Sequence, residues 1–218
     1  MGLYEKYLLP RIVHLACGSK PAMKQRAKVV PLAEGRVLEI GVGSGLNLPF
    51  YTSSKVEHVW GLDPSRDMWA LAQKKPARPD LDFEFIPAPA EKIPLDDRIA
   101  DTVLTTYTLC TIPDVGRALG EMSRVLKPEG KLLFCEHGQA PDENVRKWQD
   151  RMNPLWKKLG GGCNLNRPIS ELIEQSGFKI RDMETMYIPG WRPACFNYWG
   201  TAVLADRCSK GPFILALG

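Results

Sequence analysis

The sequence predicts an α/β protein built on a doubly wound sheet. Short apolar runs typical of buried strands alternate with helical patterns along the first two thirds of the chain. The first of these strands runs into a glycine-rich loop, and the second ends in an acid about twenty residues further on, which is the layout of nucleotide-binding sheets. The chain has 218 residues, enough for one domain with a sizeable core.

The first strand is predicted at residues 36–40, an apolar run that carries one acid, Glu39. It runs into glycines at alternate positions: Gly41, Gly43 and Gly45. Glycine permits positive φ and lets a ligand lie directly against the main chain. Residues 46–51 are predicted to form a short helix whose free N–H groups would face that ligand.

The glycine spacing bears on the cofactor. A dinucleotide fingerprint is Gly-x-Gly-x-x-Gly, and its third glycine would fall on Leu46, so an NAD-dependent dehydrogenase is disfavoured. The second strand, residues 59–62, ends at Asp63, which Pro64 follows. An acid in this place accepts hydrogen bonds from ribose hydroxyls. The alternative is a helix N-cap or turn residue.

The remaining elements follow from apolar spacing and turn signals. Strands are expected at 83–86, 101–106, the run ending at 137, 178–183 and 198–204. Helices are expected at 3–17, 21–31, 115–127, 142–158 and 168–176. The helix at 115–127 stops at a Pro-Gly turn and the chain re-enters as the fifth strand.

Three motifs in order carry a family resemblance: the Glu-x-Gly-x-Gly-x-Gly stretch from Glu39, the Ala-Glu-x-Ile-Pro-Leu stretch from Ala90, and Arg-Val-Leu-Lys-Pro-Glu-Gly-Lys-Leu-Leu from Arg124. Together they resemble the class I methyltransferases that use S-adenosyl-L-methionine (SAM) and release S-adenosyl-L-homocysteine. The resemblance implies a Rossmann-like, seven-stranded sheet of order 3-2-1-4-5-7-6 with the seventh strand antiparallel and helices on both faces. It also implies a ligand at the carboxyl ends of the strands.

The cofactor-binding residues implied by this resemblance are Glu39, Gly41, Gly43, Gly45, Asp63, Pro64, Ala90, Glu91 and Tyr107. Glu39 would orient the methionine ammonium; the alternative is a carboxylate at the strand end facing solvent. Many family members carry an acid where this chain has Pro89, so the main chain of Ala90 is the better candidate for an adenine contact. Tyr107 would lie beside the sulfonium.

A narrower resemblance lies in the Leu109-Cys110 step, the Glu136-His137 pair and a tryptophan followed by a Gly-Gly-Cys turn. Over residues 34–204 these features are similar to thiol S-methyltransferases and their bacterial relatives. The resemblance implies a small thiol as methyl acceptor. Two rivals stay open: a methyltransferase acting on a lipid or quinone, and a SAM-binding protein without catalysis.

A thiol acceptor makes chemical sense because a thiol of pKa about 8.5 needs only modest help to become a strong nucleophile. His137 is the candidate general base, since imidazole titrates near neutrality, and Glu136 is the candidate that orients or tunes it. The alternative for His137 is a strand end hydrogen-bonded to backbone. Cys110 and Cys163 are expected to be packing residues, because methyl transfer needs no enzyme nucleophile.

Cysteine spacing, net charge and hydropathy restrict the ligands and partners that this chain is expected to bind. None of the six cysteines forms a Cys-x-x-Cys pair, and His14-x-x-Cys17 has no second pair to complete it, so no metal site is expected. The net charge is +4 without a basic stripe interleaved with aromatics, which argues against nucleic acid. No apolar run approaches the roughly eighteen residues of a membrane span, so a cytoplasmic protein is expected.

The chain is expected to form one methyltransferase domain, residues 1–218, in four parts. Residues 1–33 form a helical cap, 34–137 the SAM-binding half, 138–204 the substrate-side half, and 205–218 a tail. The first thirty residues are basic. This indicates a solvated helix face beside a lid; the alternative is a weak peripheral contact with an anionic membrane surface. The pattern leaves the oligomeric state open.

Overall fold

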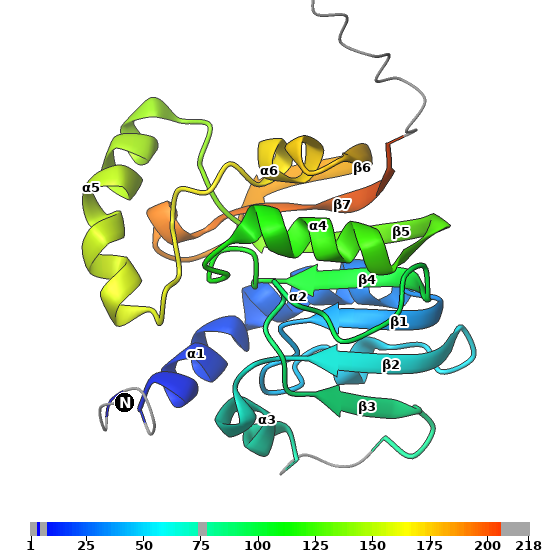
Figure 1. The fold of residues 1–218 in the computed structure, drawn as a ribbon. Helices are drawn as coiled ribbons and strands as arrows, with labels where there is room; N and C mark the ends of the chain where they lie inside the picture. Colours follow the sequence, from blue (N-terminus) through cyan, green and yellow to red (C-terminus); the bar gives the residue numbers. More distant parts are fainter. Residues whose placement is uncertain (1–3, 5–7, 74–77, 206–218) are drawn as a thin grey trace, which may run out of the picture.

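A computed structural model describes residue 4 and residues 8–73 and 78–205 (Figure 1). Its seven-stranded sheet has the order β3-β2-β1-β4-β5-β7-β6. The strands are β1 Gly35–Ile40, β2 Val56–Leu62, β3 Phe83–Ile86, β4 Ala100–Thr106, β5 Leu126–His137, β6 Phe178–Tyr187 and β7 Phe196–Leu204. Strands β1 to β5 pair in parallel, and β7 is antiparallel to both neighbours. The predicted Rossmann-like order and the antiparallel seventh strand are confirmed.

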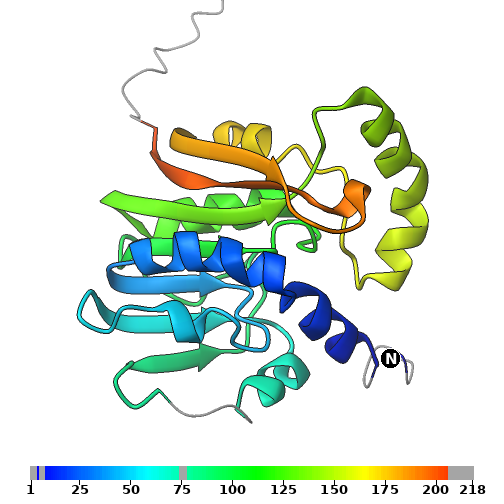
Figure 2. The same ribbon diagram turned by 180° about the vertical axis from the view of Figure 1, so that it is seen from behind.

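Helices cover both faces of this sheet. They are α1 Leu9–Cys17, α2 Lys20–Val29, α3 Arg66–Ala72, α4 Val115–Val125, α5 Glu143–Leu159 and α6 Ile169–Gln175, with 3-10 turns η2 Val30–Leu32, η3 Leu48–Phe50 and η4 Arg192–Ala194. Helices α4 and α6 lie on one face, and Figure 2 shows α2 on the other. Helices α1, α3 and α5 gather beyond the carboxyl ends of the parallel strands.

The core consists of two apolar clusters, one on each face of the sheet. In β5, Leu132 and Phe134 join the cluster beneath α4 and α6, whereas Leu133 and Cys135 join the cluster beneath α2. Strands buried on both faces need apolar residues at nearly every position. This explains why the strands around the glycine loop are readable as continuous apolar runs.

Several elements differ from the sequence prediction. The helix expected at 46–51 is only the 3-10 turn η3, Leu48–Phe50, so it offers no long helix dipole to a ligand. Helix α3 was not predicted; Ser65 begins it by accepting a hydrogen bond from the Met68 N–H at 3.2 Å. Strand β6 continues to Tyr187. The tail at 206–218 and the first residues of the predicted helix 3–17 lie outside the described residues.

Candidate active site

The glycine loop after β1 has the backbone that its sequence predicts. Gly41, Gly43 and Gly45 have φ of 71°, 49° and 66°, a region that residues with a Cβ rarely adopt. A Cβ on Gly41 would lie 2.4 Å from the Thr108 side chain, and one on Gly45 would lie 2.8 Å from Leu48. The loop is therefore packed against the segment that follows β4, and glycine is required for both its conformation and its space.

Gly41→Ala is expected to lower the free energy of unfolding by about 1–3 kcal/mol, because it adds a strained positive φ to a steric clash. The matched control is Gly120→Ala in α4, where a Cβ meets nothing within 4 Å and alanine is the better helix former, so stability should rise by about 0.5–1 kcal/mol. Urea unfolding followed by circular dichroism measures both. A neutral Gly41→Ala would show that the loop adapts to a side chain.

Asp63, the residue after β2, holds the glycine loop by hydrogen bonds to its main chain. Its Oδ2 accepts a hydrogen bond from the Gly43 N–H at 2.9 Å, and its Oδ1 accepts one from the Ser65 N–H at 2.7 Å. Burial raises the pKa of the Asp63 carboxyl above its usual value. The carboxylate therefore ties the glycine loop to the start of α3, which Pro64 introduces.

Glu39 is buried, with 1% of its surface exposed, so the alternative of a solvent-facing carboxylate is wrong. Its Oε1 accepts a hydrogen bond from Asn47 Nδ2 at 2.9 Å and its Oε2 accepts one from the Tyr51 hydroxyl at 2.6 Å. Burial raises the pKa of the Glu39 carboxyl. Two hydrogen bonds leave further lone pairs of the carboxylate free to accept from a ligand.

Arg26 joins this network from α2, which the sequence analysis missed. It was counted among the basic residues of a solvated face, yet only 4% of its surface is exposed. Its guanidinium donates to Asn47 Oδ1 at 2.8 Å and to the Thr106 hydroxyl, and its buried Nε has no partner among the described residues. The sequence spacing of Ala22, Arg26 and Val29 could have indicated this burial, because it places the three residues on the same, inward face of α2.

The two residues predicted to surround an adenine lie after β3. Ala90 is buried. The Glu91 side chain is partly exposed, and its Oε1 accepts a hydrogen bond from the Asp114 N–H at 3.2 Å, next to the start of α4. The Ala90 segment is thereby anchored to a helix of the core.

Tyr107 follows β4 in a strained conformation, with φ of 53°. Its hydroxyl donates to Asn197 Oδ1 at 2.6 Å, which ties the carboxyl end of β4 to β7. The Arg26 guanidinium lies 5.1 Å from the centre of the Tyr107 ring, and the His137 ring stacks at 6.4 Å. Tyr107 thus lies between the charged network and the predicted catalytic histidine.

Glu136 and His137 end β5 but have separate partners. The Glu136 carboxylate is fully buried and accepts hydrogen bonds from the Thr105 hydroxyl at 2.7 Å and the Thr108 N–H at 2.9 Å. Burial raises the pKa of Glu136. Neighbouring strand residues point to opposite faces, and the hydrogen bonds of Glu136 go to Thr105 and Thr108 and not to His137, which it was predicted to orient or tune. It holds the segment after β4, and any influence on the imidazole acts through space.

His137 instead meets a cysteine. Its Nε2 lies 3.2 Å from Cys163 Sγ, and its buried Nδ1 has no partner among the described residues. Cys110 completes a group in which the ligand atoms of all three residues lie within 4.8 Å of one another. The spaced pair His14-x-x-Cys17 is not part of this group, and His14 Nδ1 contacts Ser44 Oγ at 2.6 Å.

Helix α1 crosses the edge of the sheet where these groups meet. Its His14 contacts Ser44 in the glycine loop, and a Cβ on Gly161 would lie 2.9 Å from the Leu9 side chain. The helix therefore links the glycine loop to the turn that carries Cys163. Its outer surface exposes Ile12 and Leu15, and Leu8 is exposed just before it, so this region is more apolar than the solvated basic face that the sequence suggested.

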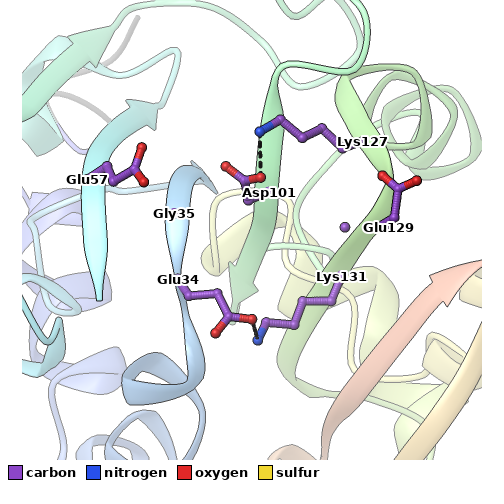
Figure 3. A pocket seen from close by; sticks show the side chains of 8 residues that line it. Glu34, Gly35, Glu57, Asp101, Lys127, Glu129 and Lys131 are labelled. Atoms are coloured by element: carbon purple, nitrogen blue, oxygen red, sulfur yellow. Dashed lines mark hydrogen bonds and ion pairs between the residues drawn. The ribbon is translucent and has the colours of Figure 1, made fainter. Parts of the chain in front are cut away.

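A separate hollow lies at the opposite, amino-terminal end of the strands (Figure 3). It is lined by Glu34, Gly35, Glu57, Asp101, Lys127, Glu129, Gly130 and Lys131. Lys127 pairs with Asp101 and Lys131 with Glu34. Because the hollow lies at the end of the sheet opposite the glycine loop, it forms no part of the candidate site.

Comparison with known proteins agrees with this architecture. Residues 38–134 match the family model of a methyltransferase domain. An S-adenosylmethionine-dependent methyltransferase from Mesorhizobium loti superposes with a TM-score of 0.62 at 19% identity, covering 85% of this chain and 98% of that one. The fold and the domain define a SAM-dependent methyltransferase.

Among sequence relatives, thiol S-methyltransferase TMT1B of Homo sapiens is 35% identical over 178 residues, 78% of this chain and 72% of that protein. The chain belongs to the methyltransferase family that includes this protein. Demethylmenaquinone methyltransferase of Clavibacter sepedonicus is 32% identical over 159 residues, 72% of this chain and 64% of that protein. In the described ranges no helix has both the length and the apolar character needed to cross a bilayer.

Proposed function

We propose that this methyltransferase transfers the methyl group of SAM to a small thiol, releasing a thioether and S-adenosyl-L-homocysteine. The observation that carries the cofactor assignment is the buried pair of opposite charges, Glu39 and Arg26, beside a glycine loop. The thiol acceptor is supported by 35% identity to a thiol S-methyltransferase. The quinone alternative is supported by a relative of similar identity.

The residues present fit SAM. Its methionine end is a zwitterion, and a buried carboxylate beside a buried guanidinium with an unpartnered Nε matches that charge pattern. Glu39 would hold the ammonium and Arg26 the carboxylate. When bound, SAM supplies an activated methyl group on a positively charged sulfur.

The other predicted cofactor residues have places in the same proposal. Asp63, next to Pro64, would accept from the ribose hydroxyls, and the main chain of Ala90 with Glu91 would border the adenine. Tyr107 would offer its ring to the sulfonium, a contact that cation–π attraction favours. Residues 34–137 would thus form the cofactor half.

On the acceptor side, His137 is the proposed group that promotes loss of the thiol proton, and Glu136 positions the segment after β4 that faces it. Residues 138–204 would supply Cys163 and Asn197 to this side, and α1 would cover it. Such a site accelerates transfer by aligning the acceptor and excluding water.

The test is an acceptor panel with SAM labelled in its methyl group. Ethanethiol and hydrogen sulfide should become labelled, whereas demethylmenaquinone and phosphatidylethanolamine should not. If only the quinone or only the lipid became labelled, that compound and not a thiol would be the methyl acceptor. Tight binding of S-adenosylhomocysteine without label in any acceptor would support a SAM-binding protein without catalysis.

Affinity for S-adenosylhomocysteine should fall as pH is lowered towards the raised pKa of Glu39. Below that pKa the free protein holds a proton on Glu39 that the ligand's ammonium must displace, so each further pH unit weakens binding by up to about tenfold. Calorimetry between about pH 5 and about pH 8 measures the slope. Glu39→Gln is the control and should bind more weakly with a flatter profile. An unchanged slope in this variant would assign the dependence to another group.

A further inference from the structure

Three side chains of different elements converge on the acceptor side of the site. Cys110 follows β4, His137 ends β5, and Cys163 follows α5, and their ligand atoms lie within 4.8 Å of one another. A tetrahedral zinc ion with bonds of about 2.3 Å to sulfur and about 2.0–2.1 Å to nitrogen places neighbouring ligand atoms roughly 3.5–3.8 Å apart. The observed separations, 3.2 Å between His137 Nε2 and Cys163 Sγ and no more than 4.8 Å within the group, need shifts of about 1 Å or less to reach this geometry.

The backbone around the two cysteines is held by its own set of hydrogen bonds. The Asn164 N–H and Nδ2 both donate to the Cys110 carbonyl, at 2.9 and 2.8 Å. Arg167 donates to the carbonyls of Leu109 and Ile112 on either side. The segments carrying Cys110 and Cys163 are therefore joined before any ligand arrives, which is what a preorganised metal site requires.

The chemistry of the three groups selects the ion. Two thiolates and an imidazole are soft ligands of the kind that bind zinc, and two thiolate charges neutralise a divalent cation. Cys110 and His137 are buried, where an unpaired thiolate is costly and a metal-bound one is not.

We infer that Cys110, His137 and Cys163 bind a zinc ion whose fourth ligand is the acceptor thiol. Three protein ligands leave one tetrahedral position open, as in catalytic zinc sites. On binding there, the thiol sulfur donates a lone pair to zinc and its proton leaves to solvent, which forms a zinc-bound thiolate. His137 then promotes ionisation as a ligand rather than by taking the proton itself. This replaces the sequence-based expectation of no metal site.

The metal site stands on its own geometry, but the role of its fourth position rests on the thiol acceptor proposed above. The first test is metal content after purification with reductant and without chelator. The wild-type chain should hold about one zinc ion, and Cys110→Ser and Cys163→Ser should bind zinc at least about tenfold more weakly. Cys195→Ser is the matched control, because Cys195 is a buried cysteine outside the cluster, and it should retain zinc. Binding of S-adenosylhomocysteine verifies that each variant folds.

Substitution of cobalt for zinc makes the ligands visible in the absorption spectrum. Tetrahedral cobalt should give intense visible bands, together with a thiolate-to-cobalt charge-transfer band whose intensity corresponds to two thiolate ligands. Addition of ethanethiol should raise the intensity of the thiolate band by about one half as a third thiolate joins. Absence of stoichiometric zinc from wild type, equal zinc loss in Cys195→Ser, or a Cys110–Cys163 disulfide that persists in protein purified with reductant would overturn the site. An unchanged cobalt spectrum with ethanethiol would overturn the role of the fourth position.

The thiol-acceptor proposal and the zinc-site proposal can be refuted independently of each other. Zinc binding without methylation of any thiol would refute the thiol acceptor and leave the metal site in place. Methylation of ethanethiol at an undiminished rate by a protein that never binds zinc would refute the metal site and leave the thiol acceptor in place.

Discussion

Replacement of Arg26 by methionine is expected to lower the free energy of unfolding by about 3–5 kcal/mol. The substitution removes one charge of a buried network and leaves the Glu39 carboxylate uncompensated, and breaking such buried pairs costs about this much. It also leaves Asn47 Oδ1 and the Thr106 hydroxyl without their guanidinium donor. Urea unfolding measures the loss, and calorimetry should show that S-adenosylhomocysteine binding is lost with it.

Lys24→Met is the matched control for Arg26. It removes a cation from the same helix at an exposed position, where substitutions typically change stability by less than about 0.5 kcal/mol. A Glu39→Gln substitution added to Arg26→Met should recover part of the lost stability, since the two groups are coupled. Strictly additive effects in the double variant would show that the two charges do not stabilise each other.

Asp63→Ala is expected to weaken the binding of S-adenosylhomocysteine by about 1–3 kcal/mol, or roughly 5–150-fold. The substitution removes the acceptor for the Gly43 and Ser65 N–H groups, at 2.9 and 2.7 Å, and with it the proposed ribose contact. The measurement is calorimetric titration at constant pH.

Asp67→Ala is the charge-matched control, because Asp67 is exposed in the first turn of α3 and should leave affinity unchanged. Asp63→Asn retains one acceptor and should have an intermediate effect. If affinity survives Asp63→Ala while stability falls, Asp63 is a turn residue that shapes the glycine loop without contacting the ligand.

Much of the fold could be predicted from local pattern. The continuous apolar run of β1 and the alternate glycines after it predicted a buried strand and a loop with positive φ, and both are confirmed. The pattern succeeded here because burial on both faces and the need for glycine are properties of single positions. The strand order came from the family resemblance instead, because nothing in one strand specifies its neighbour.

The candidate site was less predictable, and each miss has a tertiary cause. In the sequence, Arg26 resembles any surface cation of a basic helix, but in the structure α2 packs against the sheet and buries it. Glu136 was paired with His137 because they are adjacent in sequence, yet the strand directs them to different partners. Cys110 and Cys163 were expected to be packing residues because methyl transfer needs no enzyme nucleophile, and their separation by more than fifty residues gave no sign that they lie together.

The sequence by itself determined the alternation of strands and helices, the glycine loop and the acids that end β1 and β2, because these depend on local conformation and on burial at each position. Only the tertiary structure decided which charges and sulfurs meet. A buried charge needs a partner and a metal needs several ligands, and those groups are supplied by strands and helices distant along the chain. The Glu39–Arg26 network and the group of Cys110, His137 and Cys163 exist only once the sheet has formed.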